Sequence, residues 1–191
     1  MLIDKLITLT EPFASEWELL AGNVLGKDVH ADRKNGFILS RMALLSALEE
    51  AGVRASPKEM ILTDYSQLKQ YPQFTVSLSH TKGFGASLIA DKKTYLSVGI
   101  DIEQEARPVK DMIIERISNP GDLRLRNIEL WCLKEAAFKA LMNTGKFQLP
   151  LGFSSLCIGD KVWTHSPSGT SGKWELGRIN SILMAKAFLL N

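Results

Sequence analysis

The order of helix-like and strand-like patterns constrains the fold of this chain more than any other sequence feature. Apolar residues recur at helical spacing over residues 37–48, after Asn35-Gly36, and Gly52 is placed to end that helix. Residues 74–79 then alternate between apolar and polar, which predicts a half-buried strand. Two further strands are predicted at 85–90 and 95–102, with a turn between them.

The second half of the chain repeats this order. A helix is predicted over residues 109–117, opened by Pro108 and with Met112, Ile113 and Ile117 as its apolar stripe, and a second one from about residue 122 to 142. Strands are predicted at the end of the chain, over 153–158, 162–164, 173–176 and 182–190. We therefore expect an α+β protein that is a pseudo-dimer of two similar α/β lobes, each a long helix packed on an antiparallel sheet. The expected lobes are residues 1–95 and 96–191.

Composition and charge exclude several classes of protein. The 191 residues are 45% hydrophobic and 23% charged, and the net charge is only +2. Together with the absence of basic runs, this gives no indication of nucleic-acid binding. Neither a secretory signal nor a membrane span is evident, so we expect a cytoplasmic protein without a membrane partner. Cys132 and Cys157 are expected to be reduced thiols, and the cysteines and histidines lack the spacing of a zinc site.

Two carboxylates in one predicted strand are the first sign of a functional site. Asp101 and Glu103 are two residues apart, so their side chains point to the same face. Val98, Ile100 and Ile102 are expected to face the core, which places both carboxylates on the opposite, wetter face. Adjacent carboxylates repel each other, and a hard cation such as Mg²⁺ between them would compensate. The alternative is that they form only the solvent face of an edge strand.

The second sign is a predicted helix that carries Trp131, Lys134, Glu135 and Lys139. Glu135 and Lys139 are spaced i, i+4 and share a face. They could form an ordinary solvated ion pair. Trp131 lies one turn before Glu135, however, and a tryptophan in that position favours the edge of a cleft.

Ser79-His80, at the end of a predicted strand, is the third sign. Adjacent strand residues point to opposite faces, so the two cannot readily act as a nucleophile and its base. The chain also lacks a G-x-S-x-G elbow here. We therefore reject a hydrolase triad, and a hydrogen-bonded structural histidine remains an alternative.

Taken in order, the three motifs resemble those of the 4′-phosphopantetheinyl transferases: Ser79-His80, then Gly99-x-Asp101-x-Glu103, then Trp131-x-x-Lys134-Glu135-Ala136-x-x-Lys139. The chain is most similar to the single-chain, two-lobed group that activates surfactin synthetase, over residues 37–153. The resemblance implies a Mg²⁺-dependent enzyme that transfers the phosphopantetheine arm of coenzyme A to a serine of an apo acyl or peptidyl carrier protein and releases 3′,5′-ADP. Coenzyme A would bind in a cleft between the lobes, and we expect a monomer.

The resemblance also implies roles for the acidic residues and the helix lysine. Asp101, Glu103 and Glu135 would be the magnesium ligands, in the C-terminal lobe, with Glu103 binding directly or through water. Asp101, Glu135 and Lys139 would be catalytic. Glu135 would take the proton from the carrier serine, and Lys139 would hold the pyrophosphate.

Three further residues would bind the nucleotide end of coenzyme A. The resemblance places Ser79 and His80 there, with His80 at the 3′-phosphate. Arg41, in the predicted N-terminal helix, matches a basic residue of the family and would contact the same phosphate. Arginine suits this role because its planar fork can bind phosphate oxygens in pairs.

The chain departs from the family pattern at three places. Asp122 stands where the family usually has a glutamate, Lys69 is the nearest candidate for a family lysine before Ser-His, and Phe147 stands where a glycine is common. These departures leave open a non-catalytic module that binds a carrier protein or nucleotide. A magnesium-dependent phosphohydrolase would also use clustered carboxylates and is the other alternative.

Overall fold

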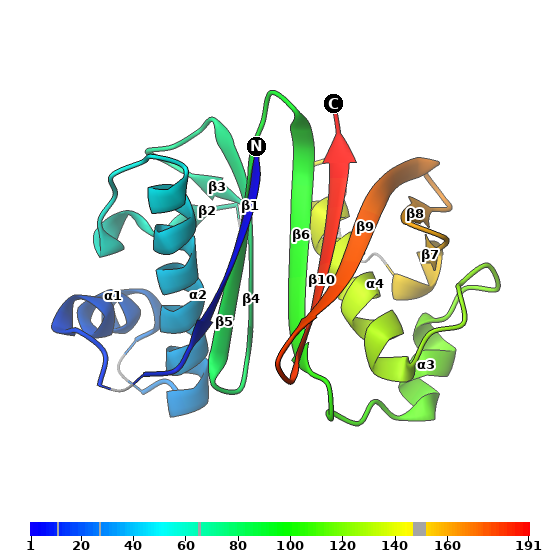
Figure 1. The fold of residues 1–191 in the computed structure, drawn as a ribbon, viewed down its shortest axis with the longest axis horizontal. Helices are drawn as coiled ribbons and strands as arrows, with labels where there is room; N and C mark the ends of the chain where they lie inside the picture. Colours follow the sequence, from blue (N-terminus) through cyan, green and yellow to red (C-terminus); the bar gives the residue numbers. More distant parts are fainter. Residues whose placement is uncertain (11, 27, 65, 147–151) are drawn as a thin grey trace.

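The computed structural model describes residues 1–10, 12–26, 28–64, 66–146 and 152–191 (Figure 1). The elements in chain order are β1 (Leu2–Thr8), α1 (Ser15–Leu25), α2 (Ala31–Glu50), η1 (Pro57–Glu59), β2 (Leu62–Thr63), β3 (Gln67–Leu68), β4 (Phe74–Thr81), β5 (Phe84–Asp91), β6 (Tyr95–Gln104), α3 (Asp111–Ile117), α4 (Asn127–Met142), η2 (Phe153–Ser155), β7 (Leu156–Ile158), β8 (Val162–His165), β9 (Thr170–Ile179) and β10 (Ile182–Leu190). The sheets are antiparallel, as expected for an α+β protein. Among these residues, no helix is long and apolar enough to cross a membrane.

Helix α2 packs on a three-stranded sheet with the strand order β1-β5-β4 (Figure 1). The helix begins at Ala31, six residues earlier than predicted, because the His30 side chain caps it by accepting a hydrogen bond from the Asp32 amide at 3.3 Å. Gly36 therefore lies inside the helix instead of before it. Gly52 follows the helix with φ of +78°, so it ends the helix as predicted.

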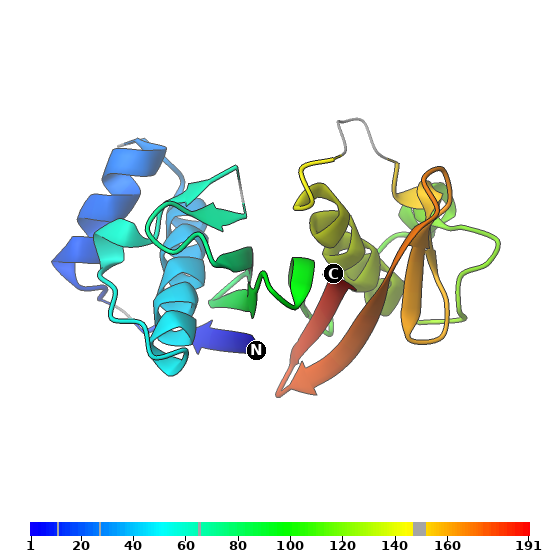
Figure 2. The same cartoon turned by 90° about the horizontal axis from the view of Figure 1, so that it is seen from above.

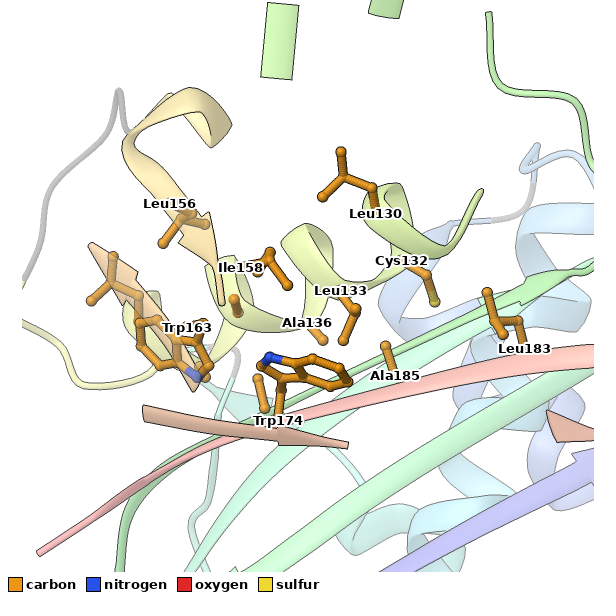
Figure 3. Close-up of a cluster of buried hydrophobic side chains, with 14 of the residues drawn as sticks. Leu130, Cys132, Leu133, Ala136, Leu156, Ile158, Trp163, Trp174, Leu183 and Ala185 are labelled. Atoms are coloured by element: carbon orange, nitrogen blue, oxygen red, sulfur yellow. The ribbon is translucent and has the colours of Figure 1, made fainter. Parts of the chain in front are cut away.

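Helix α4 packs on a five-stranded sheet with the order β6-β10-β9-β8-β7. The contact between helix and sheet is apolar, and Figure 3 shows Leu133 and Ala136 of α4 close to Trp174 and Ala185. Small side chains on both surfaces allow a close approach of helix and strands. The position of α4 on this sheet determines which residues of the helix can reach strand β6.

The structure corrects three predictions in the second half. In α3 the exposed fractions of Met112 and Ile113 are 56% and 37%, and Ile114 points inward together with Ile117, which was the one correctly predicted member of the stripe. Helix α4 begins at Asn127, not near residue 122, because Asp122 is used in a turn and accepts a hydrogen bond from the Ile158 amide at 2.8 Å. Residues 153–155 form a 3₁₀ turn before β7.

The two sheets lie side by side, with β4 of one next to β6 of the other (Figures 1 and 2). A shared apolar cluster joins them and includes Leu88 of β5, Ile100 of β6 and Met184 of β10. The predicted turn between β5 and β6 is present, but it connects two different sheets. Strand β4 is buried on both faces instead of half-buried, because α2 covers one face and the second sheet adjoins the other.

Candidate functional site

A cavity of about 360 Å³ lies where β4, β6 and α4 meet. Its lining includes six of the seven residues predicted for the site; the full lining is Leu78, Ser79, His80, Asp101, Glu103, Arg107, Trp131, Glu135 and Lys139. Trp131 borders the cavity, as predicted from its place on the helix. Arg41 is the only predicted site residue outside this lining.

A glycine brings the acidic strand and the helix together. A Cβ at Gly99 would overlap with the backbone of α4 at Ala136 and Ala140, so only glycine fits here without moving the helix. Two residues before Gly99, the Ser97 hydroxyl donates a hydrogen bond to the Ala140 carbonyl oxygen of α4 at 2.6 Å. This close packing places Glu135 of α4 at the same cavity as the β6 carboxylates.

Asp101 is buried, with an exposed fraction of only 6%, so the expectation of a wetter face is wrong. Its Oδ1 accepts hydrogen bonds from the Ser79 hydroxyl at 2.8 Å and from Lys139 Nζ at 2.7 Å. Lys139 Nζ also donates to the Ile100 carbonyl oxygen at 2.9 Å. Asp101 Oδ2 is buried and has no hydrogen-bond partner. Buried polar atoms normally have partners, so an orphan oxygen beside a cavity indicates a place for a ligand.

Glu103 is also buried, and it pairs with Arg107, four residues further along the chain. The Thr81 hydroxyl is 3.4 Å from its Oε2. The Arg107 guanidinium lies 5.8 Å from the centre of the Trp131 ring, within reach of a cation–π interaction. Arg107 was not predicted from the sequence, because a spacing of four residues brings side chains together in a helix and not at the end of a strand.

Glu135 of α4 is a half-buried carboxylate of the cavity. Burial raises the pKa of Glu135, and the negative charge of Asp101 raises it further. The positive charges of Lys139 and Arg107 lower the pKa and offset part of this effect. A carboxylate with a raised pKa is a better proton acceptor when ionised, as general-base catalysis requires.

The three carboxylates have the chemistry of a magnesium site. Within the described residues, however, no three His, Cys, Asp or Glu side chains are grouped so that they could hold a metal ion as they stand. Lys139 and Arg107 instead provide the positive charge beside Asp101 and Glu103. Hard carboxylate oxygens, including the orphan Oδ2 of Asp101, are the ligands that Mg²⁺ prefers. The donor types therefore fit Mg²⁺, whereas their arrangement in the described residues does not yet form a metal site.

His80 also lines a second cavity of about 500 Å³, whose lining includes the charged residues Asp32, Arg33 and Lys82. Burial lowers the pKa of His80, as do the positive charges of Lys139 and Arg41. The two cavities share His80 and are therefore adjacent. Neither basic residue of the second cavity was singled out from the sequence.

Arg41 is a partly buried cation behind His80. Its guanidinium lies 3.8 Å from the centre of the Phe37 ring, and Nη1 donates to the Ser40 hydroxyl at 3.1 Å. Burial lowers its pKa to about 10. Among the described residues no carboxylate forms an ion pair with it, and Nε has no hydrogen-bond partner. A desolvated cation of this kind favours an anionic ligand nearby.

The three residues that depart from the family pattern were Asp122, Lys69 and Phe147. Asp122 forms an ion pair with the fully buried Lys134 at 2.7 Å, which is a structural role. It lies outside the lining of the cavity. Lys134 is therefore not part of a solvated helix face. Lys69 is exposed and lines neither cavity. Phe147 lies outside the described residues.

The structure thus brings Ser79 and His80 of β4 together with the acidic residues of β6 and α4 at one cavity. Comparison with known proteins gave no matching family model and no matching curated protein.

Proposed function

We propose that this protein transfers the 4′-phosphopantetheine arm of coenzyme A to a serine of an apo acyl or peptidyl carrier protein, with Mg²⁺ as cofactor. The observation that supports this most is the meeting of three carboxylates and Lys139 at one cavity, next to a second cavity whose lining includes Arg33 and Lys82 as well as Asp32. Coenzyme A has a pyrophosphate in its middle and a phosphorylated nucleotide at one end. The pyrophosphate would lie at Lys139 and the carboxylates, and the nucleotide phosphate would lie toward Arg33 and Lys82.

In the proposed reaction the carrier serine oxygen attacks the β-phosphorus of coenzyme A. The bond from that phosphorus to the bridging oxygen breaks, and 3′,5′-ADP leaves with the bridging oxygen. Glu135 takes the serine proton, a role supported by its raised pKa. Lys139 holds the pyrophosphate, and its Nζ already lies 2.7 Å from Asp101. Positioning and electrostatic stabilisation account for most of the catalysis of phosphoryl transfer.

Asp101, Glu103 and Glu135 would hold the magnesium ion. When bound, the ion would neutralise negative charge on the pyrophosphate oxygens. Lys139 and Arg107 balance the charges of the β6 carboxylates in the structure described here. Since Lys139 would also bind the phosphates, we expect its contact with Asp101 to change when substrate binds.

The nucleotide end is proposed to bind on the other side of His80. His80 and Arg41 would contact the 3′-phosphate, and the buried charge of Arg41 supports this assignment. Ser79 is less suited to the nucleotide because its hydroxyl is already bonded to Asp101. Arg33 and Lys82 add positive charge to the second cavity.

We further propose that residues 1–95 and 96–191 are two similar lobes of a monomeric, cytoplasmic pseudo-dimer, with coenzyme A bound between them. In support, α2 packs on the antiparallel sheet of the first segment and α4 on the antiparallel sheet of the second. The cavity takes Ser79 and His80 from one segment and its carboxylates from the other.

Intact-protein mass spectrometry tests the proposed function. Apo carrier proteins are incubated with this protein, coenzyme A and Mg²⁺, and we expect a carrier to gain one phosphopantetheine arm and to lose that gain with EDTA. Absence of gain on every carrier, with measurable coenzyme A binding, would favour a non-catalytic module. Release of phosphopantetheine or phosphate without a carrier would favour the phosphohydrolase.

The first prediction concerns the carboxylates. Asp101→Asn and Glu135→Gln should each abolish transfer while leaving the thermal unfolding temperature within a few degrees of wild type. Glu105→Gln is the matched control, because Glu105 follows the same strand but pairs with Arg126 and Arg178 and does not line the cavity. Near wild-type turnover of either site variant in the mass-spectrometric assay would contradict the assignment.

A further inference from the structure

We propose that Ser79 is a positioning residue of the metal site, and that its hydroxyl fixes the carboxylate of Asp101 and joins the acidic strand to the neighbouring sheet. The inference rests on the proposed function to the extent that a divalent cation is expected at Asp101. It assigns Ser79 to the metal site instead of to the nucleotide, where the family resemblance places it.

Serine side chains link the two sheets at their junction. β4 and β6 belong to different sheets, yet serine side chains of β4 bond to the backbone of β6. Ser77 Oγ accepts from the Ile100 amide at 3.0 Å, and Ser79 Oγ accepts from the Ile102 amide at 3.2 Å. The two serines therefore satisfy backbone donors that would otherwise be left unpaired in a buried place.

Ser79 forms more hydrogen bonds than Ser77. The Ser79 hydroxyl also donates to Asp101 Oδ1 at 2.8 Å, and it accepts from Lys139 Nζ at 3.3 Å. A hydroxyl has one donor and two acceptor positions, and these three bonds use all of them. Ser79 thus has no remaining hydrogen-bonding capacity for a nucleotide while this network holds.

The two carboxylate oxygens of Asp101 have different surroundings. Oδ1 is held by Ser79 and Lys139, whereas Oδ2 has no partner and is buried beside the cavity. The residue is more than nine-tenths buried, so the carboxylate cannot readily reorient into water. Holding one oxygen fixes the direction of the other, and the free oxygen is the one available to a cation. Outer groups that orient a ligand in this way typically contribute 10–100-fold to metal affinity.

The chain offers a matched control. Ser77→Ala and Ser79→Ala each remove one hydroxyl from the same buried strand and one bond to a β6 amide. Only Ser79→Ala also removes the bonds to Asp101 and Lys139. A purely structural role predicts that Ser79→Ala lowers stability but leaves metal affinity equal to that of Ser77→Ala, whereas the positioning role predicts a difference in metal affinity.

The experiment measures Mn²⁺ affinity by electron paramagnetic resonance, with Mn²⁺ as the probe for Mg²⁺, and thermal unfolding of the same samples. We expect Ser79→Ala to weaken Mn²⁺ binding about 10-fold and Ser77→Ala to change it less than about twofold. The unfolding temperature should fall in both variants, and further in Ser79→Ala because it loses two more hydrogen bonds. Ser79→Thr, which keeps the hydroxyl, should restore most of the affinity. If Ser79→Ala does not fold, Ser79→Cys replaces it, with an intermediate loss expected from the weaker thiol donor.

Equal Mn²⁺ affinity of the two alanine variants would overturn the inference. So would a loss of 3′,5′-ADP affinity in EDTA, with Mn²⁺ binding unchanged, because that result assigns Ser79 to the nucleotide. Absence of Mn²⁺ binding to the wild-type protein would overturn the inference together with the proposed metal site. A negative transfer assay with intact, Ser79-dependent Mn²⁺ binding would instead overturn the proposed transferase and leave the inference standing.

Discussion

Gly36 has no functional group of its own, but it determines where the His80 ring can lie. A Cβ at Gly36 would overlap with this ring, which packs against the glycine from strand β4. We predict that Gly36→Ala displaces His80 and weakens coenzyme A binding in the same direction as His80→Ala. Isothermal titration of coenzyme A into each variant measures the effect.

Gly22→Ala is the control for the effect of alanine on a helix. Gly22 lies in α1, and a Cβ there would meet no atom within 4 Å. Alanine should stabilise that helix by up to about 1 kcal/mol and leave coenzyme A affinity unchanged. Wild-type affinity of Gly36→Ala, with its unfolding temperature raised as in Gly22→Ala, would show that His80 does not depend on this contact.

His165 connects burial to the pH dependence of stability. It is almost fully buried, and burial lowers its pKa below the usual 6.5. The unfolded chain therefore binds a proton first as pH falls below about 6.5, and stability falls from there toward the lower pKa of the folded state. The contribution is at most about 1.4 kcal/mol per pH unit.

We predict that His165→Gln loses less stability than wild type between pH 7.5 and 5.5. Urea unfolding at the two pH values measures this difference. Some pH dependence should remain in the variant, because the pKa of His80 is lowered as well. Parallel losses in the two proteins would mean that His165 ionises equally easily in the folded and unfolded states.

At the scale of elements, residue patterns predicted the strands and helices of the site well. Apolar alternation located β4, two strand-like runs on either side of a turn located β5 and β6, and the i, i+4 spacing placed Glu135 and Lys139 on one face of α4. Strand β10 was predicted with the same bounds as observed. These elements have strong periodicity over several residues, which is why sequence alone can identify them.

Other elements depend on contacts that a local pattern does not contain. The helix stripe of α3 was assigned to Met112, Ile113 and Ile117; only Ile117 is buried as predicted, and Ile114 packs inward because η2 and α4 lie on that side. The start of α4 was placed too early because Asp122 reads as a helix-opening residue, whereas in the fold it pairs with Lys134. The burial of Asp101 likewise comes from β4 and α4, which the sequence of β6 cannot indicate.

Lys134 joins three elements beneath the site. Its ammonium group pairs with Asp122 and donates to the carbonyl oxygens of Ile117 and Leu156, each at 2.7 Å. We predict that Lys134→Met destabilises the protein by about 3–5 kcal/mol, because it leaves a buried carboxylate without its partner. Chemical denaturation followed by circular dichroism gives the free energy of unfolding.

A double-mutant cycle separates the ion pair from the rest of the packing. Lys134→Met combined with Asp122→Asn should cost less than the sum of the two single variants, since no unpaired buried charge remains. Additive costs would show that the two side chains contribute independently. In that case the lost bonds to the backbone carbonyls would account for the effect of Lys134→Met.

Contacts between the two sheets lie beside the candidate site. On one side of the junction, serines of β4 and Lys139 of α4 bond to β6. On another, Lys186 of β10 forms ion pairs with Asp4 of β1 at 3.1 Å and with Glu175 of β9 at 2.9 Å. Because the cavity takes side chains from both sheets, its geometry depends on their association.

The shared core makes a prediction about unfolding. Leu88, Ile100 and Met184 form one apolar cluster between the sheets, so separating them would expose this surface. We therefore expect a single cooperative transition in urea. In Trp17→Phe, fluorescence comes from Trp131, Trp163 and Trp174 alone, all in the second half of the chain, and its midpoint should still coincide with that of circular dichroism. Leu88→Ala should lower both midpoints together and reduce the free energy of unfolding by about 2–5 kcal/mol. Two separate midpoints would instead show that residues 1–95 and 96–191 unfold independently, and that the contact between the sheets contributes little to either.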